Sequence, residues 1–241
     1  MRVIKNFFVR HTPRTVRFYH RIRTTLRSFL ELPSSLFVDE TNIQIPAHNW
    51  PVYGLVVTGR FVKREKRFYY EEELIPHFKK MMHRGGIFFD VGASIGYWSY
   101  VAVWLGAKQV VAFEPIADLT RTLRQVGERY RLPITIVNHS LGEPKQEVSV
   151  HNSQASLRQE GRSLDDFVRA TGIVPTVIKI DVDGNEPGVI HGALRVLREH
   201  HPDLFLEVRP ETRYLVDELR QIGYREKLRL GNDESFIILT A

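Results

Sequence analysis

The chain has 241 residues, of which 43% are hydrophobic and 26% charged, a composition that suits one globular domain with an extension. It contains no cysteine, which excludes disulfides, thiolate metal sites and a cysteine nucleophile. No apolar run reaches the roughly 18 residues that a membrane span needs, and the first residues lack the apolar core of a secretory signal. We therefore expect a soluble, cytoplasmic protein.

The net charge of +6 is concentrated at the amino terminus. Residues 1–30 contain eight of the 34 basic residues and no acid, which leaves 26 basic against 28 acidic residues in the rest of the chain. Thr12-Pro13 supplies an N-cap followed by proline, and apolar residues then recur at helical spacing among arginines. This pattern predicts a basic amphipathic helix over residues 1–33. Such a helix can pack on the domain or on a second subunit, or lie on an anionic membrane surface, whereas no recognition motif supports nucleic acid.

A small β element is expected over residues 34–69, where β-like runs at Leu36–Val38 and Gly54–Val57 are interrupted by prolines. The main domain then covers residues 70–241. It begins with a predicted helix from Tyr70 to His83, which two glycines end.

Strands and helices alternate through the main domain, which predicts a parallel sheet covered on both faces. The expected strands are Ile87–Val91, Val110–Phe113, Ile134–Val137, Val177–Ile180 and Leu204–Val208, with an extra strand at Glu147–Val150. The expected helices are Ile95–Leu105, Asp118–Tyr130, a helix capped by Ser163 and ending at Ala170, Pro187–Leu197 and Glu211–Ile222. Tyr224–Leu230 and Ser235–Thr240 form a closing hairpin. The fold class is therefore α/β and Rossmann-like, with seven mostly parallel strands and an antiparallel edge.

A glycine turn follows the first of these strands and predicts a nucleoside site. Gly92 and Gly96 lie in the turn, and Glu114 ends the second strand about 20 residues further on, where an acid can accept hydrogen bonds from ribose hydroxyls. The turn is one glycine short of a pyrophosphate loop, and the chain has no Gly-Lys-Ser/Thr motif. A cofactor with a ribose but no phosphate is favoured, and S-adenosylmethionine is the common one. The competing interpretation is that the glycines serve only helix–strand packing.

Several motifs in this order resemble the FkbM family of methyltransferases. They are Asp90-Val-Gly-Ala-Ser-Ile-Gly-Tyr97, Val111-Ala-Phe-Glu-Pro115, Ser163-Leu-Asp-Asp166, Ile178-Lys-Ile-Asp-Val-Asp-Gly-Asn-Glu186, His191-Gly-Ala193 and Leu206-Glu-Val208. The resemblance covers about residues 70–210. It implies a class I methyltransferase fold, S-adenosylmethionine as methyl donor, and a hydroxyl acceptor on a sugar, glycan or secondary metabolite.

The chain departs from the family pattern at three positions. Asp183 stands where the family usually has glutamate, Asn185 where it has alanine, and Ser94 where it has asparagine. The shorter acid at Asp183 puts a substrate contact at that position in doubt. An asparagine that the family carries in the helix after Glu114 has no counterpart that we can place.

The cofactor residues are expected at the carboxyl ends of the strands, where ligands of open parallel sheets bind. Their expected roles are Asp90 toward the α-ammonium, Gly92, Ala93 and Gly96 around the methionine and ribose, Glu114 on the ribose hydroxyls, and Asn138 and Ser140 at the adenine edge. Ser140 could equally be a plain turn residue.

The acceptor side of the site is expected at the ends of the fourth and fifth strands. An alcohol needs its proton accepted as it attacks, and Asp181 is the first candidate for this base or positioning role, with Glu186 second. Asp183 and Glu207 could orient the acceptor, or complete a divalent-metal site with Asp181, although linear spacing does not favour a metal. His139 and Ser153, the latter in a polar stretch after the extra strand, are further acceptor contacts or solvated surface residues.

Other functions remain open at this level. The acceptor could be an amine or a carboxyl group, or the chain could be a non-catalytic scaffold attached to a membrane or complex through residues 1–30. The partners expected are a small-molecule or glycan acceptor and, through the basic helix, a membrane surface or a second copy, without nucleic acid.

Overall fold

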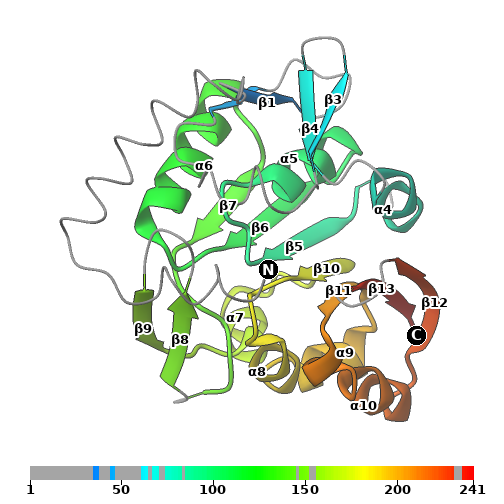
Figure 1. The fold of residues 1–241 in the computed structure, drawn as a ribbon. Coiled ribbons are helices and arrows are strands. Elements are labelled where there is room, and N and C mark those ends of the chain that lie inside the picture. Colours follow the sequence, from blue (N-terminus) through cyan, green and yellow to red (C-terminus); the bar gives the residue numbers. More distant parts are fainter. Residues whose placement is uncertain are drawn as a thin grey trace, which may run out of the picture.

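The computed structural model describes residues 35–37, 44–46, 61–64, 67–70, 74–82, 85–144, 147–151, 156–230 and 235–241. Its centre is a seven-stranded sheet with the order β12-β13-β11-β10-β5-β6-β7 (Figure 1). The strands are β5 (Ile87–Val91), β6 (Gln109–Phe113), β7 (Ile134–Val137), β10 (Val177–Ile180), β11 (Asp203–Val208), β12 (Arg225–Leu230) and β13 (Ser235–Thr240).

Five of these strands are parallel, and the carboxyl-terminal hairpin is antiparallel. β5 pairs with β6 and β10, β6 pairs with β7, and β10 pairs with β11, all in parallel. β13 pairs antiparallel with both β11 and β12. The predicted class I methyltransferase topology with an antiparallel edge is therefore confirmed.

Helices cover both faces of the sheet, so the central strands are buried on both sides and their sequences are almost entirely apolar (Figure 1). One face carries α4 (Ile75–Met81), α5 (Tyr97–Trp104) and α6 (Ala117–Tyr130). The other face carries α7 (Leu164–Thr171), α8 (Glu186–His191), α9 (Leu194–His200) and α10 (Leu215–Gln221).

Neighbouring residues of β5 enter different halves of this core. Phe88 packs edge-on against Phe78 of α4, with ring centroids 5.1 Å apart. Phe89 points to the opposite face, where its ring lies 5.4 Å from that of Phe113 and 5.7 Å from that of Phe167 in α7. This alternation is the period of two that a strand imposes on its side chains.

Two predicted helices are each divided in the structure. The helix expected at Pro187–Leu197 breaks between α8 and α9, where Gly192 packs so closely on the loop after β7 that a Cβ at this position would lie 2.4 Å from the Gly142 carbonyl oxygen. The helix expected at Glu211–Ile222 becomes a short 3₁₀ turn, η4 (Pro210–Thr212), followed by α10. The first boundary lies at a tertiary contact that periodicity does not reveal, and the second lies beside local bonds between Arg209 and Thr212.

Two further differences concern strands. The extra strand β8 (Glu147–His151) pairs antiparallel with β9 (Ser156–Glu160), a strand that was not predicted. Tyr70, expected in a helix, ends strand β4 (Arg67–Tyr70), and the helix begins only at Ile75.

The described amino-terminal residues form two hairpins. β1 (Ser35–Phe37) pairs with β2 (Gln44–Pro46), and β3 (Phe61–Arg64) pairs with β4. The first lies within the β element expected from the sequence. The helix predicted over residues 1–33 and the run Gly54–Val57 lie outside the described residues.

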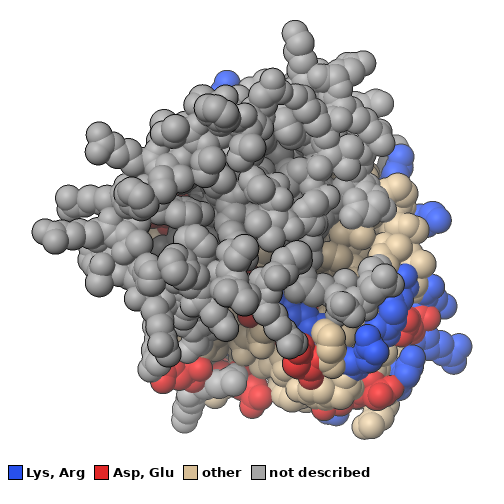
Figure 2. All heavy atoms as spheres, in the orientation of Figure 1, with Lys and Arg blue, Asp and Glu red and all other residues tan. Residues whose placement is uncertain are grey.

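The described surface has mixed charge. Basic and acidic side chains alternate over the part of the face seen in Figure 2 that is coloured, and α10 and β12 contribute ion pairs such as Arg220–Asp217 at 2.7 Å and Arg229–Glu226 at 3.0 Å. Within the described ranges, no helix is long and apolar enough to cross a membrane.

Candidate active site

The glycine turn after β5 is packed against the end of the neighbouring strand β10. Gly92 has φ 81°, a left-handed conformation, and a Cβ at this position would lie 1.8 Å from the backbone oxygen of Asp181. No side chain fits there without displacing the β10 loop. The packing role considered for the glycines is therefore real at Gly92, where it brings two segments that carry predicted site residues into contact.

The backbone donors of this turn point into the protein. The bonds are Gly92 N and Ala93 N to Phe113 O, both at 3.0 Å, Ser94 N to Glu114 Oε2 at 2.9 Å, and Gly96 N to Ala93 O at 2.8 Å. A pyrophosphate site needs such N–H groups to converge on the ligand instead. These four N–H groups are therefore not available to form a ring of donors around a phosphate.

Glu114 joins the ends of β5 and β6. Its buried carboxylate accepts hydrogen bonds from Ile116 N and Ser94 N, both at 2.9 Å. Burial raises the pKa of Glu114 to about 7, because water no longer solvates the charged form, and the two backbone bonds only partly offset this. Each carboxylate oxygen accepts one of these bonds and keeps a second lone pair.

Beneath the turn lies a buried charged group that spans β5 and β10. Asp90 Oδ2 accepts a 2.6 Å hydrogen bond from Ser99 Oγ, whereas Asp90 Oδ1 has no hydrogen-bond partner in the described part of the chain. Burial raises the pKa of Asp90, and the nearby Lys179 opposes that effect. Lys179 lies opposite Asp90 in the strand pairing, is only 2% exposed, and donates to Asp181 Oδ2 at 3.0 Å.

Lys179 was not among the predicted site residues. Its signal in the sequence is a single lysine in an otherwise apolar strand, Val177–Ile180, that is buried on both faces. A lysine is rarely buried so fully unless it is paired. Because it forms an ion pair with Asp181, a buried cation lies next to the predicted base.

Glu186 stabilises the loop after β10 by accepting hydrogen bonds from the loop backbone. Glu186 Oε1 accepts hydrogen bonds from Val182 N at 3.2 Å and Gly184 N at 3.1 Å, and Glu186 Oε2 is buried without a described partner. Asp183 in this loop has φ 56°, a left-handed conformation that aspartate adopts more readily than glutamate. The departure from the family pattern at Asp183 therefore suits its backbone.

Arg209 is a second residue that the sequence analysis missed. Its Nη2 donates to Asp183 Oδ1 at 2.9 Å and to Glu207 Oε2 at 3.1 Å, so it connects the end of β11 with the loop after β10. Burial works to lower the pKa of Arg209, but the carboxylates of Glu207, Asp183 and Glu186 outweigh it and raise the pKa. The only sequence signal is a cation two residues after the strand-end acid Glu207.

The side chains of Lys179 and Arg209 form ion pairs with the carboxylates that were considered as metal ligands. Asp183 and Glu207 share Arg209, and Asp181 is paired with Lys179. Among the residues that the structure describes, no group of three histidine or carboxylate side chains has an arrangement suited to a metal ion.

The end of β7 supports the segment around Glu114. Asn138 Nδ2 donates to the backbone oxygens of Glu114 and Pro115, both at 2.9 Å. His139 Nδ1 contacts the backbone oxygen of Ser140 at 2.9 Å, and Ser140 is buried. Asn138 therefore holds the backbone around Glu114 in place. Both of these bonds use its side-chain nitrogen, so the predicted contact with adenine would have to come from its other atoms. Ser153, the other predicted acceptor contact, lies outside the described residues.

Two of the family-like motifs have structural roles. Ser163 Oγ caps α7 by accepting from Asp166 N at 3.0 Å, and the Asp165 carboxylate caps α9 by accepting from Arg195 N and Val196 N. Asn185, the second departure, donates to Leu141 O at 2.9 Å and so ties the β10 loop to the segment after β7.

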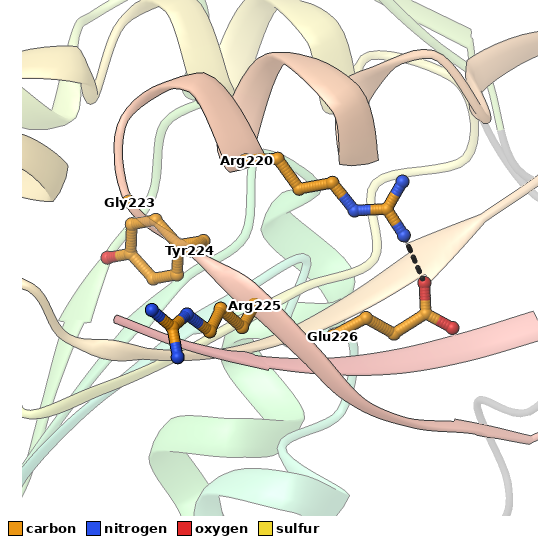
Figure 3. A pocket seen from close by; sticks show the side chains of 5 residues that line it. All are labelled: Arg220, Gly223, Tyr224, Arg225 and Glu226. Carbon is orange, nitrogen blue, oxygen red and sulfur yellow. Dashed lines mark hydrogen bonds and ion pairs between the residues drawn. The ribbon is translucent and has the colours of Figure 1, made fainter.

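Two surface depressions lie away from this rim. One of about 500 Å³ is lined by Arg220, Gly223, Tyr224, Arg225 and Glu226 (Figure 3). It opens at the start of β12, which pairs with the end of β13 and so lies near the amino end of β11. Another, of about 460 Å³, lies between residues 174–176 and 200–203. Neither contains the glycine turn or the strand-end acids. The carboxyl rim is the candidate active site because those residues gather there.

The sheet order, the glycine turn and the strand-end acids define a Rossmann-like class I methyltransferase fold. Within this class the chain belongs to the FkbM methyltransferase family, since the family model described as "Methyltransferase FkbM domain" matches residues 90–226. The resemblance seen in the sequence motifs is thereby confirmed.

Solved structures agree with this fold. Methyltransferase FkbM from Methylobacillus flagellatus KT is 24% identical, with a TM-score of 0.53, over 65% of this chain and 44% of that one. The chain thus spans less than half the length of that protein. A precorrin-6y C5,15-methyltransferase from Geobacter metallireducens GS-15 is 14% identical, with a TM-score of 0.50, over 76% of this chain and 95% of that one. No curated protein matches the sequence.

Proposed function

We propose that the protein transfers a methyl group from S-adenosylmethionine to a hydroxyl group of a sugar, glycan or secondary metabolite. The observation that carries the cofactor assignment is the glycine turn, whose donors are bonded inward while an acid stands at the end of β6. A phosphate-bearing cofactor would need the opposite arrangement. A nucleoside without phosphate fits.

The residues present suit this cofactor. S-adenosylmethionine carries two positive groups, a sulfonium and an α-ammonium, and the rim offers acids to both. Asp90 Oδ1 is a buried acceptor without a described partner, which an ammonium group or a bridging water would satisfy. We assign the ribose hydroxyls to Glu114, whose carboxylate ends β6 beside the glycine turn, and the absence of a Cβ at Gly92 keeps the β10 loop close to the turn.

We assign to Asp181 the removal of the proton from the acceptor hydroxyl. When bound, S-adenosylmethionine supplies a methyl group on a sulfonium, and displacement by the acceptor oxygen leaves the sulfur as a neutral thioether. Asp181 is 20% exposed and is held by Lys179, whereas Glu207 is 3% exposed and committed to Arg209. Asp181 can therefore accept a hydrogen bond from the attacking hydroxyl and take its proton, while the buried ammonium of Lys179 fixes the direction of the carboxylate.

Calorimetric titration with S-adenosylhomocysteine tests the cofactor assignment, with NADH as the control ligand. We expect saturable binding of S-adenosylhomocysteine alone, and loss of that binding in Glu114→Ala. Glu128→Ala, which removes an acid from α6 outside the rim, is the matched control and should bind normally. Binding of NADH, or unchanged affinity in Glu114→Ala, would overturn the assignment.

A transfer assay with labelled methyl donor then tests the acceptor class. Hydroxylated sugars and metabolites should accept the label, and amines and carboxylates of similar size should not. Asp181→Asn is expected to lower kcat by about 100-fold or more without weakening S-adenosylhomocysteine binding. Efficient labelling of an amine or carboxylate in preference to a hydroxyl would contradict the proposal.

A further inference from the structure

Three buried side-chain atoms at the rim lack a hydrogen-bond partner among the described residues. They are Asp90 Oδ1 in β5, Glu186 Oε2 in the first residue of α8, and Arg209 Nε in the residue after β11. Buried polar groups are almost always bonded, and an unsatisfied one costs about 1–3 kcal/mol. The proposed function gives Asp90 a role toward the cofactor. It leaves the other two atoms unexplained.

Glu186 and Arg209 lie on two sides of the same glycine. Gly184 N donates to Glu186 Oε1 at 3.1 Å, and a Cβ at Gly184 would lie 3.9 Å from Arg209 Nη1. The Glu186 carboxylate also acts on the Arg209 guanidinium strongly enough to contribute to its raised pKa. The two unpartnered atoms therefore belong to one small region beside the β10 loop.

The chemistry of this pair is one acceptor and one donor. Glu186 Oε1 is already engaged by two backbone N–H groups, and Arg209 Nη2 by two carboxylates, so Oε2 and Nε remain for a ligand. A single group that donates and accepts at once can satisfy both atoms. A hydroxyl group does so, donating to Oε2 and accepting from Nε–H.

We propose, building on the proposed function, that Glu186 Oε2 and Arg209 Nε form a subsite that binds a second, non-reacting hydroxyl group of a neutral polyhydroxylated acceptor. The acceptor class is thereby a sugar or polyol with at least two hydroxyls. Glu186 and Arg209 fix the molecule, and Asp181 meets the hydroxyl that is methylated.

The surrounding charges disfavour an anionic acceptor. Three carboxylates, of Asp183, Glu186 and Glu207, surround the single guanidinium of Arg209, so an anionic group would be repelled. The same charges attract an ammonium group, so the argument against an amine rests on hydrogen bonding alone. An ammonium group brings only donors and leaves the Nε–H of Arg209 without an acceptor.

Saturation-transfer NMR on the protein saturated with S-adenosylhomocysteine tests this subsite. Three probes share one ring: methyl glucoside has only neutral hydroxyls, glucosamine carries an amine, and glucuronate carries a carboxylate. Methyl glucoside should give the strongest signal. Glu186→Gln keeps an oxygen for the backbone bonds but removes the free acceptor, and Arg209→Lys keeps the charge but removes Nε–H. Each should reduce the methyl glucoside signal at least about fivefold.

Matched controls make the same chemical changes outside the subsite. Glu211→Gln and Arg213→Lys alter exposed residues of the next segment and should leave the signal unchanged. Melting temperatures identify any variant that does not fold, and the other variant then decides. An unchanged signal in a folded Glu186→Gln or Arg209→Lys variant would mean that the pair holds only a water molecule, and would overturn the proposal.

The outcome also separates this inference from the proposed function. Failure to bind S-adenosylhomocysteine defeats the proposed function. Normal binding of S-adenosylhomocysteine without any methyl glucoside signal, or with a stronger glucosamine or glucuronate signal, defeats the subsite alone.

Discussion

Ser94 donates its backbone N–H to Glu114 Oε2 at 2.9 Å, and this bond joins the glycine turn after β5 to the end of β6. The acid proposed to hold the ribose is therefore also a structural part of the turn that shapes the pocket. Any change in the charge of Glu114 alters both the ligand contact and the conformation of the turn.

Cofactor binding should depend on pH through Glu114. Because burial raises the pKa of Glu114 to about 7, most molecules are protonated at pH 6 and ionised at pH 8. If the ionised form binds the ribose hydroxyls, S-adenosylhomocysteine should bind about tenfold more weakly at pH 6 than at pH 8. Calorimetry across this range measures it. Glu114→Gln should bind weakly at both values, and a wild-type affinity independent of pH would contradict the assignment.

Gly92→Ala should be strongly destabilising, and Gly85→Ala is its matched control. Both glycines have φ 81°, so both substitutions carry the same conformational cost, but only at Gly92 would the Cβ lie 1.8 Å from the Asp181 oxygen. We expect a loss of about 1 kcal/mol at Gly85 and of about 3 kcal/mol or more at Gly92. Urea unfolding monitored by circular dichroism gives both values. Equal losses would show that the contact is relieved without cost.

Ser94→Asn should stabilise the protein. Ser94 has φ 53°, a left-handed conformation that asparagine adopts more readily than serine, and its backbone bond to Glu114 does not depend on the side chain. A gain of about 0.5–1 kcal/mol in the free energy of unfolding is expected. Ser94→Val, a branched residue in the same conformation, should lose about 1–3 kcal/mol. Urea midpoints that moved in the opposite order would argue against the backbone explanation.

His191 should stabilise the fold more at low pH than at high pH. Its Nδ1 lies 3.2 Å from Glu143 Oε1 and its Nε2 lies 3.0 Å from Glu218 Oε2, and only the imidazolium can donate to both. The Glu218 contact raises the pKa of His191, burial opposes this, and Glu143 adds to it. The stabilisation is therefore complete below the ordinary pKa of 6.5 and is lost as the pH rises through the raised value.

Melting temperatures of wild type and His191→Asn at pH 6 and pH 9 measure this effect. The difference between the two proteins should be larger at pH 6. The side chains are partly exposed, so the effect is modest and should shrink further in high salt. A difference that grew toward pH 9 would reverse the sign of the argument.

The sheet and the cofactor side of the site could be predicted from local patterns. Buried parallel strands appear in the sequence as short apolar runs. The glycine turn and Glu114 each follow directly after such a run, so their places in the sequence are enough to predict that they lie at the carboxyl ends of the strands. The structure confirms the fold and the family. The roles assigned to individual site residues stay predictions.

The acceptor side could not be predicted in the same way. Arg209 donates a hydrogen bond to Asp183 although the two residues are 26 positions apart in the sequence. Lys179 lies opposite Asp90 only because β10 pairs with β5. These pairings change the roles available to the strand-end acids, since Asp181, Asp183 and Glu207 are each paired with a cation. Gly192 divides a helix for a similar reason, because its neighbour is a backbone oxygen from the loop after β7.

The Asp165 cap on α9 has a consequence for how the molecule opens. α9 has seven residues and no side-chain cap of its own, and its first N–H groups depend on a carboxylate 30 positions earlier. A helix this short does not persist alone in water. α9 can therefore exist only while α7 is docked beside it, and the two should exchange their amide hydrogens together, as one cooperative unit on the face of the sheet opposite the glycine turn's helix.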